Sequence, residues 1–419
     1  MSGKSEILEL GLPNEYASAK AGLVSLTQPQ HIASFSFGEE RELLLDDASK
    51  DSSLKWYGRQ PALGIDLRYG FERCIWRSDE LDEGLDALLD CLLHKLKNQK
   101  ATRALAQMLR KTAVITWRGM LTKIMTCIYE ETEGWEMNAM MLDGCLYLEE
   151  NKSPLKKKAR QEGQQLVQTY FGYSFESYCA SDNPASSAAP HDSWGGDVNT
   201  NVQWASVIRT SVEDVSIILG GEVDCVKEGA GLNSGLTTSD FVELKTNLVI
   251  ENPRDEVRFE RYKLLKHYVQ SVLLGVPSVV VGFRQPNGIL ASIQSFDTIE
   301  LPNCVAGKAH AWHALTCFNS GHQILNFILT TLSTSPHVQA YDQMPAANPA
   351  PVFRLTFVPG TRTGPASITI RQLNRTEVEE TKARKTSKEE RIGFLLARWV
   401  HSMQDRKTTL PPSSAELNY

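Results

Sequence analysis

The sequence predicts an α+β fold, and two kinds of pattern indicate it. Two apolar runs, 217–225 and 240–247, flank a connector rich in Gly, Asn and Ser, which predicts two neighbouring strands of a hairpin. Apolar residues recur at helical spacing over 79–97 and 255–274, which predicts two amphipathic helices. Strands and helices therefore both occur in long, strongly patterned segments.

The composition is that of an ordinary globular protein. The chain has 419 residues, of which 42% are hydrophobic and 22% charged, enough for one large domain or two smaller ones. The net charge of −6 argues against a generally basic nucleic-acid coat, so nucleic acid would need a local basic cleft. Eight cysteines without a CxxC pair predict reduced thiols. Without a signal peptide or a long apolar run, we expect no membrane association and a cytosolic or nuclear protein.

Taken in order, the chain starts with a weakly patterned stretch, residues 1–30, which we expect to be an N-terminal arm. Residues 180–198 predict an exposed loop, and residues 401–419 a polar C-terminal tail. Further strands are expected at 32–37, 113–118, 135–148, 278–284, 288–296, 352–358 and 367–373, and residues 202–207 lead toward the central strands. Further helices are expected at 103–110, at 377–391 and from the lysine-rich segment through to residue 171, and a loop is expected at 334–351.

Charged residues at period two mark both central runs. Glu222 and Asp224 project to one side of their strand, as do Glu243 and Lys245 of theirs. One interpretation is a set of cross-strand salt bridges at the surface. The other is a metal site, since charges in an apolar setting are costly unless they are paired or bind a metal. The ExK unit begins nineteen residues after the ExD unit ends, and this combination favours the metal site.

Carboxylates and a lysine on adjoining strands suit metal-assisted phosphodiester chemistry. Hard oxygen ligands select Mg²⁺ or Mn²⁺. One ion can activate a water while a second stabilises the leaving oxygen. A lysine beside them can orient that water or neutralise charge developing on the phosphate.

Three further residues are candidates for the same site. Arg118 ends a predicted buried strand before a glycine and could bind a phosphate. Glu176 closes an aromatic run and could be a fourth metal-binding acid or form a local hydrogen bond. Gln270 shares a helix face with Lys266, which could lie across the metal site or simply face solvent.

A lysine-rich segment and a pair of histidines each allow two interpretations. Residues 156–160, rich in lysine, predict either a nuclear-import patch or, more readily, a solvated helix start. His310 and His313 are spaced i,i+3 in an expected helix, but no further ligands are suitably spaced for zinc, which favours packing histidines.

Five motifs in order resemble the DXO family of RNA 5′-end decapping enzymes, most closely the nuclear fungal branch that partners the nuclear 5′→3′ exoribonuclease. The motifs are Trp117-Arg118-Gly119, residues 172–176, residues 221–224, Glu243-Leu244-Lys245 and residues 270–275. Asp224 with the Glu243-x-Lys245 unit also resembles the core of PD-(D/E)xK nucleases. The resemblance implies a single domain over 31–400, with mixed β-sheets flanked by helices.

The resemblance also implies roles for individual residues. Lys245 and Gln270 would contact the scissile phosphate and the attacking water, completing a catalytic set with Glu222, Asp224 and Glu243. The implied ligands of two Mg²⁺ or Mn²⁺ ions are Glu176, Glu222, Asp224, Glu243 and the carbonyl of Leu244. Substrate contacts are implied for Arg41, Glu83, Trp117, Arg118 and Gly119, and for Glu222, Lys245 and Gln270.

The function that the resemblance implies is hydrolysis at RNA 5′ ends. Such an enzyme would remove pyrophosphate or cap nucleotides from triphosphate, incompletely capped or NAD-capped RNA during 5′-end quality control. It would also bind and activate a nuclear 5′→3′ exoribonuclease, which implies the nucleus, with the cytoplasm as the other compartment. One alternative is a mainly non-catalytic partner that stabilises this exoribonuclease. Another is a DNA nuclease with the same core.

Overall fold

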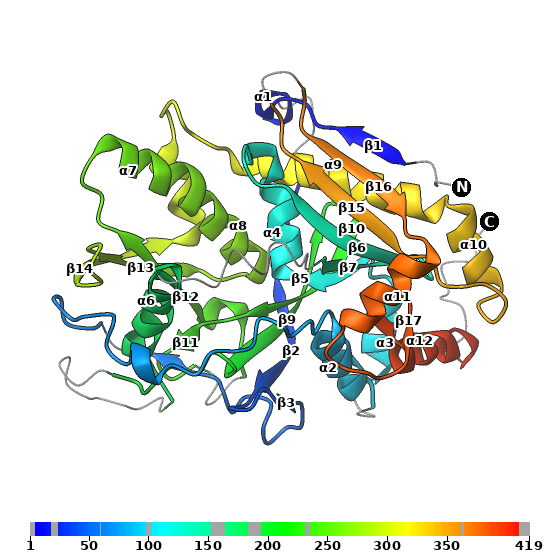
Figure 1. The fold of residues 1–419 in the computed structure, drawn as a ribbon, viewed down its shortest axis with the longest axis horizontal. Coiled ribbons are helices and arrows are strands. Elements are labelled where there is room, and N and C mark those ends of the chain that lie inside the picture. The colour runs from blue at the N-terminus through cyan, green and yellow to red at the C-terminus, as the bar shows by residue number, and fades with distance from the viewer. Residues whose placement is uncertain are drawn as a thin grey trace.

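The computed structural model of the chain describes residues 5–17, 24–58, 60–97, 102–151, 164–182, 194–230, 235–361 and 364–409. Within these ranges the chain forms a large sheet (sheet A), a smaller sheet (sheet B), a two-stranded ribbon and helices packed on the sheets (Figure 1). The predicted α+β fold with mixed sheets is confirmed. The lysine-rich segment 156–160 and much of the predicted loop 180–198 lie outside the described residues.

Sheet A is mixed, because β5 runs parallel to both of its neighbours, β7 and β10, while the other pairings are antiparallel. An edge strand, β1, comes from the segment expected to be an N-terminal arm and pairs with β16. The strands lie in the order β1 (Glu6–Glu9), β16 (Ser367–Gln372), β15 (Phe353–Val358), β6 (Trp135–Leu142), β7 (Cys145–Glu150), β5 (Val114–Trp117), β10 (Val215–Glu222), β9 (Gln203–Val212), β2 (Gln30–Phe37) and β3 (Leu43–Leu44).

Sheet B is also mixed, with β12 parallel to β13 and β11 parallel to β4. The hairpin predicted over 278–296 is confirmed as β13 and β14. The strands lie in the order β14 (Leu290–Asp297), β13 (Ser278–Arg284), β12 (Phe241–Leu248), β11 (Cys225–Lys227), β4 (Trp56–Tyr57) and β8 (Ala180–Ser181). The ribbon is β17 (Arg391–Ile392) with β18 (Leu395–Leu396).

The central hairpin is placed differently from the prediction. The run 217–225 does not pair with the run 240–247 along its length, because β10 belongs to sheet A and β12 to sheet B. The chain leaves sheet A after Glu222 and enters sheet B at Cys225, where the short strand β11 pairs with the start of β12. The ExD unit therefore spans the passage from one sheet to the other, and the ExK unit lies on sheet B.

The helices cover the sheets, and in the described chain none has both the length and the apolar character to cross a bilayer. They are α1 (Pro13–Tyr16), α2 (Asp86–Lys97), α3 (Thr102–Arg110), α4 (Arg118–Thr126), α6 (Gln164–Cys179), α7 (Pro253–Arg258), α8 (Leu265–Leu274), α9 (Ala314–Ser333), α10 (Pro336–Gln343), α11 (Arg375–Arg384) and α12 (Ala397–Thr409). Short 3₁₀ helices cover Phe71–Arg73, Cys127–Tyr129, Thr238–Asp240 and Thr298–Val305.

Several predicted helix limits are wrong. The helix expected over 79–97 begins only at Asp86, because Gly84 has a left-handed φ of 52° that interrupts a right-handed helix. The loop expected over 334–351 contains α10. His310 and His313 precede α9 and are not helical, and His310 pairs with Glu260.

The helix expected over 255–274 is helical throughout but contains a π-helical stretch, Phe259–Leu264, between α7 and α8. A π turn adds a residue to the turn and so rotates the residues that follow it. Tyr262, which the regular spacing placed on the apolar side, is 40% exposed as a result, whereas Glu260 is buried.

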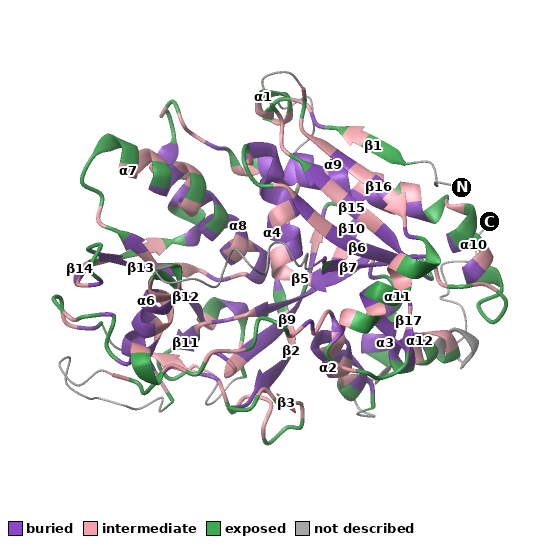
Figure 2. Ribbon diagram, viewed as in Figure 1, coloured by how far each residue is buried: buried purple, intermediate pink, exposed green. Residues whose placement is uncertain are grey.

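Both faces of sheet A are covered, which explains the continuous apolar runs in its central strands. Ile217 and Leu219 of β10 pack in the cluster that includes α4, α8 and α9, whereas Ile218 packs on the opposite side with α2, α3 and α12. Figure 2 shows buried residues along these strands and on the inner sides of the helices.

Close packing of α8 on β10 yields a stability prediction. A Cβ at Gly221 would lie 2.6 Å from Cδ2 of Leu274, a fully buried side chain. We expect Gly221→Ala to lower the free energy of unfolding by about 1–3 kcal/mol, measured by urea denaturation. The control is Gly172→Ala in α6, where no described heavy atom lies within 4 Å of the added carbon. That variant should be neutral or more stable, since alanine favours helix. Equal effects in both variants would contradict the packing argument.

Candidate active site

The four acids of the predicted site converge where sheets A and B meet. Glu222 ends β10, and Asp224 lies two residues on, before β11. Glu243 lies within β12 and is 1% exposed. Glu176 lies on α6, which packs against β12, and its carboxylate interacts electrostatically with those of Asp224 and Glu222. The structure thus brings together residues from a helix, the end of one sheet and the middle of another.

Cations and N–H groups surround these carboxylates. Glu243 Oε2 accepts a hydrogen bond from Arg118 Nη1 at 3.0 Å, and its Oε1 lies 2.6 Å from Lys245 Nζ. Asp224 Oδ2 accepts the backbone N–H of Leu244 at 2.7 Å. Burial without such partners would make the charged forms very costly.

The pKa values show how unevenly the positive charge is shared. Burial opposes ionisation of Glu243, but Arg118 and Lys245 overcome it and lower its pKa to about 2. Burial raises the pKa of Asp224 to about 6, and it also raises the pKa of Glu222. The pKa of Glu176 is raised well above its usual range by burial and then by the charge of Asp224.

The ammonium of Lys245 lies among three of the predicted metal ligands. Its Nζ is 2.6 Å from Glu243 Oε1, 3.1 Å from the Leu244 carbonyl and 3.5 Å from Asp224 Oδ2. Burial tends to lower the pKa of Lys245, but Asp224 and Glu243 outweigh burial and raise it.

The donor set at this point fits a divalent cation. In the described ranges, no three acidic, histidine or cysteine side chains are yet arranged around one ion. However, Glu243 Oε1 is buried without a hydrogen-bond partner among the described residues, although it is paired electrostatically with the lysine. Oxygen donors already gathered around one positive charge are of the type that Mg²⁺ and Mn²⁺ prefer.

The Trp117-Arg118-Gly119 motif forms the junction of β5 and α4. Trp117 ends β5 and donates its Nε1–H to the carbonyl of Gly84 at 2.7 Å. Arg118 begins α4 and points its guanidinium at Glu243, and Gly119 follows in the same turn. A helix N-terminus attracts anions, so a phosphate that displaces the guanidinium from the carboxylate would meet both groups.

Arg41 and Glu83 are joined, which their separation in sequence does not reveal. Arg41 donates from Nε and Nη2 to the two oxygens of Glu83 at 2.9 and 2.8 Å. Its backbone is left-handed, with φ of 70°, a conformation that is uncommon for residues other than glycine. Glu83 is therefore paired, and its side chain is only 22% exposed.

Two residues that no sequence pattern singled out connect this pair to the acids. Arg77 lies 3.3 Å from both Glu83 Oε2 and Gln203 Oε1. Gln203 accepts a hydrogen bond from Arg41 at 2.5 Å and donates to Glu222 Oε2 at 3.0 Å. A polar residue opening an apolar strand could have drawn attention to Gln203, but Arg77 lies in an irregular segment without a pattern.

Gln270 lies half-buried on α8, and the neighbours of Gln270 on this helix contact the site. His267, one turn earlier, is buried and interacts electrostatically with Lys245 and Glu243. Leu274, one turn later, packs against Gly221 beside Glu222. Lys266, which shares a face with Gln270, instead pairs with Glu130 at 3.4 Å.

Curated relatives of this chain are decapping proteins. The chain is 41% identical over 345 residues to the decapping nuclease RAI1 of Cryptococcus neoformans, a match covering 79% of this chain and 86% of that protein. It is 35% identical over 329 residues to the human decapping and exoribonuclease protein, covering 77% and 79%.

Solved structures of fungal Rai1 share the fold. S. pombe Rai1 in complex with 3′-FADP superposes with a TM-score of 0.66 at 26% identity, covering 88% of this chain and all of that one. Candida albicans Rai1 in complex with pU5-Mn²⁺ gives a TM-score of 0.76 at 21% identity, covering 96% and 100%. The family model described as RAI1-like PD-(D/E)XK nuclease matches residues 27–395. This chain therefore belongs to the RAI1-like PD-(D/E)XK nuclease family.

Proposed function

We propose that this protein is a divalent-metal-dependent RNA 5′-end hydrolase, a decapping nuclease. The observation that carries the proposal is the position of the Lys245 ammonium among Glu243, Asp224 and the Leu244 carbonyl. A cation held by those oxygens beside Arg118 and the N-terminus of α4 suits attack on a phosphate.

The relatives support this proposal. Relatives similar in sequence are named decapping nucleases, and the C. albicans structure holds pU5 with Mn²⁺. The S. pombe structure holds 3′-FADP, a dinucleotide, which supports including NAD-capped RNA among the substrates beside triphosphate and incompletely capped ends.

Divalent ions bound by Glu176, Glu222, Asp224, Glu243 and the Leu244 carbonyl would supply Lewis-acid activation of a water and neutralise the leaving oxygen. The residues of the chain have complementary tasks. Lys245 and Gln270 orient the water and the scissile phosphate. Arg118 and the first turn of α4, which includes Gly119, bind 5′-end phosphates.

The substrate's 5′ end would contact a surface formed by Arg41, Glu83 and Trp117, which we call the 5′-end wall. Arg41 and Glu83 are held by their bidentate pair, and Trp117 by its hydrogen bond to Gly84. Because these side chains are fixed before substrate arrives, little ordering is required on binding.

The proposal extends to a nuclear 5′→3′ exoribonuclease that the protein binds and activates, and hence to a nuclear location. It rests on the motif resemblance to the fungal branch. The second candidate is that stabilising this exoribonuclease is the main role and the pocket is inactive. The acids, with their cations around them, favour catalysis.

The first prediction concerns products from 5′-end-labelled triphosphate and capped RNAs with Mg²⁺ or Mn²⁺. Wild type should release pyrophosphate or the cap nucleotide, and the Glu222→Ala/Asp224→Ala double variant should lose at least about 10³-fold in rate, because charge stabilisation is lost at the reacting phosphate. The control is Glu136→Gln on β6, a carboxylate that pairs with Arg354 away from the acids.

Two results would contradict the catalytic proposal. One is a folded wild type that gives no metal-dependent product from any RNA. The other is a wild type that cuts duplex DNA but no 5′-triphosphate RNA, which would select the DNA nuclease. If an exoribonuclease copurifies equally with wild type and the double variant, the partner role is separate from catalysis.

The second prediction is that the affinity of the protein for Mn²⁺ decreases as the pH is lowered. Asp224, with a pKa of about 6, must lose its proton to bind a cation, so protons compete with the metal as pH decreases. For this group alone we expect about fourfold weaker binding at pH 5.5 than at pH 7.5, and more from the raised pKa values of Glu222 and Glu176. Isothermal titration calorimetry measures the change, with Glu136→Gln as the control. An affinity that is constant over this range would contradict a site built on these acids.

A further inference from the structure

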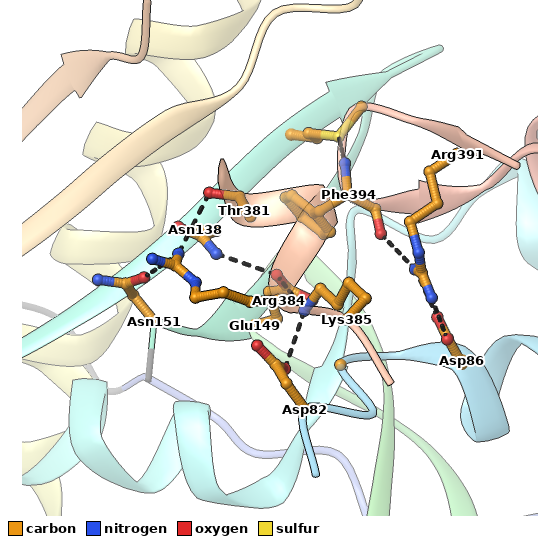
Figure 3. A network of polar contacts seen from close by, with 12 residues as sticks. Asp82, Asp86, Asn138, Glu149, Asn151, Thr381, Arg384, Lys385, Arg391 and Phe394 are labelled. Carbon is orange, nitrogen blue, oxygen red and sulfur yellow. Dashed lines mark hydrogen bonds and ion pairs between the residues drawn. The ribbon is translucent and has the colours of Figure 1, made fainter. Parts of the chain in front are cut away.

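A buried lysine near the C-terminus ties distant parts of the chain together (Figure 3). Lys385 follows α11 and is 0% exposed. Its Nζ donates to both oxygens of Glu149 at 2.7 Å and to Asp82 Oδ1 at 3.1 Å. Burial of a lysine is costly unless its charge is paired in this way.

The same segment makes two more contacts with residues 82–86. Thr386 exchanges hydrogen bonds with Asp82: its backbone N–H donates to the Asp82 carbonyl at 3.0 Å, and its Oγ1 accepts from the Asp82 N–H at 2.7 Å. Arg391 donates from Nη1 to Asp86 Oδ1 at 2.9 Å and also pairs through Nη2 with Oδ2. We call Lys385, Thr386 and Arg391 the C-terminal clamp.

The residues between Asp82 and Asp86, the two aspartates that the clamp contacts, support the 5′-end wall. Glu83 is a member of that wall, and the Gly84 carbonyl holds the indole of Trp117 at 2.7 Å. Gly84 itself packs against the clamp, because a Cβ there would lie 2.7 Å from Lys385 Nζ and 2.5 Å from Glu149 Oε2.

The other partner of the lysine fixes the clamp to sheet A. Glu149 lies on β7, next to Leu148, which is in register with Thr116 of β5. Its Oε1 also accepts a hydrogen bond from Asn138 of β6 at 3.0 Å (Figure 3). The lysine therefore connects the loop that carries Glu83 to the strand beside the one that ends at Trp117.

We propose that Lys385 is a positioning residue that sets Glu83 and Trp117 for the RNA 5′ end, an inference that rests on the proposed function. The clamp contacts neither the acids nor Lys245 among the described interactions, so its effect is on substrate binding. Loss of the clamp should displace the wall while the metal ligands stay in place.

The test compares Lys385→Met with wild type on a 5′-triphosphate RNA in Mn²⁺. We expect KM to rise about tenfold, the ratio that one lost charge-assisted contact produces, with kcat within about twofold and Mn²⁺ affinity unchanged. Thr386→Val, at an exposed position that should not prevent folding, should raise KM less but in the same direction.

The matched control is Arg398→Met. Arg398 on α12 makes a bidentate pair with Asp90 of α2 at 2.9 and 2.7 Å, so it also ties the C-terminal region to α2. Its charge acts on Asp86, but Arg398 makes no described hydrogen bond or ion pair with residues 82–86. This variant should keep the wild-type KM. Melting temperatures of all variants report any general loss of stability.

A double-mutant cycle with Glu83→Ala separates positioning from stability. If Lys385 acts through the wall, Lys385→Met should raise KM much less in the Glu83→Ala background than in wild type. Three results would overturn this inference and leave the proposed function standing. They are an unchanged KM in Lys385→Met, full additivity in the cycle, and an equal rise of KM in Arg398→Met. A wild type that turns over no RNA would overturn the proposed function together with it.

Discussion

Burial of several carboxylates in one small volume is the constraint on which the rest of this structure depends. Such groups repel one another and lose hydration, so they are kept together only where positive charge is supplied from fixed positions. Arg118 at the start of α4 and Lys245 on β12 supply it from two sides. These two cations do not fully compensate the negative charge, since the pKa values of Glu222 and Glu176 remain raised. The cluster therefore suits further cations.

The fold meets this constraint by joining two sheets at one short crossing. Because β10 ends at Glu222 and β11 begins at Cys225, the ExD unit lies at the boundary and Asp224 can accept the N–H of Leu244 from sheet B. Helix α8 packs closely on Gly221 through Leu274, beside the end of β10 at the same boundary. The site is therefore a property of how the sheets meet and does not belong to either one alone.

Features that depend on neighbouring residues could be predicted from the sequence. They are the alternation of charges in the ExD and ExK units, the β13–β14 hairpin, and the long helices apart from their limits. The sequence did not reveal that β10 pairs with β5, since a partner that far away leaves no local signal. Gln203 and Arg77 were missed because their importance comes from what they contact in the folded chain. Likewise, Lys385 belongs to a charged segment that resembles a solvated helix, yet it is fully buried.

The pairing of β1 with β16 has a consequence for the order in which the protein is made. Residues 6–9 pair with residues 367–370, so this edge of sheet A cannot form until residue 370 has left the ribosome. The segment after α11, which contacts Asp82 and Asp86, is synthesised later still. A growing chain therefore holds all the acids well before it holds the residues that contact Asp82 and Asp86.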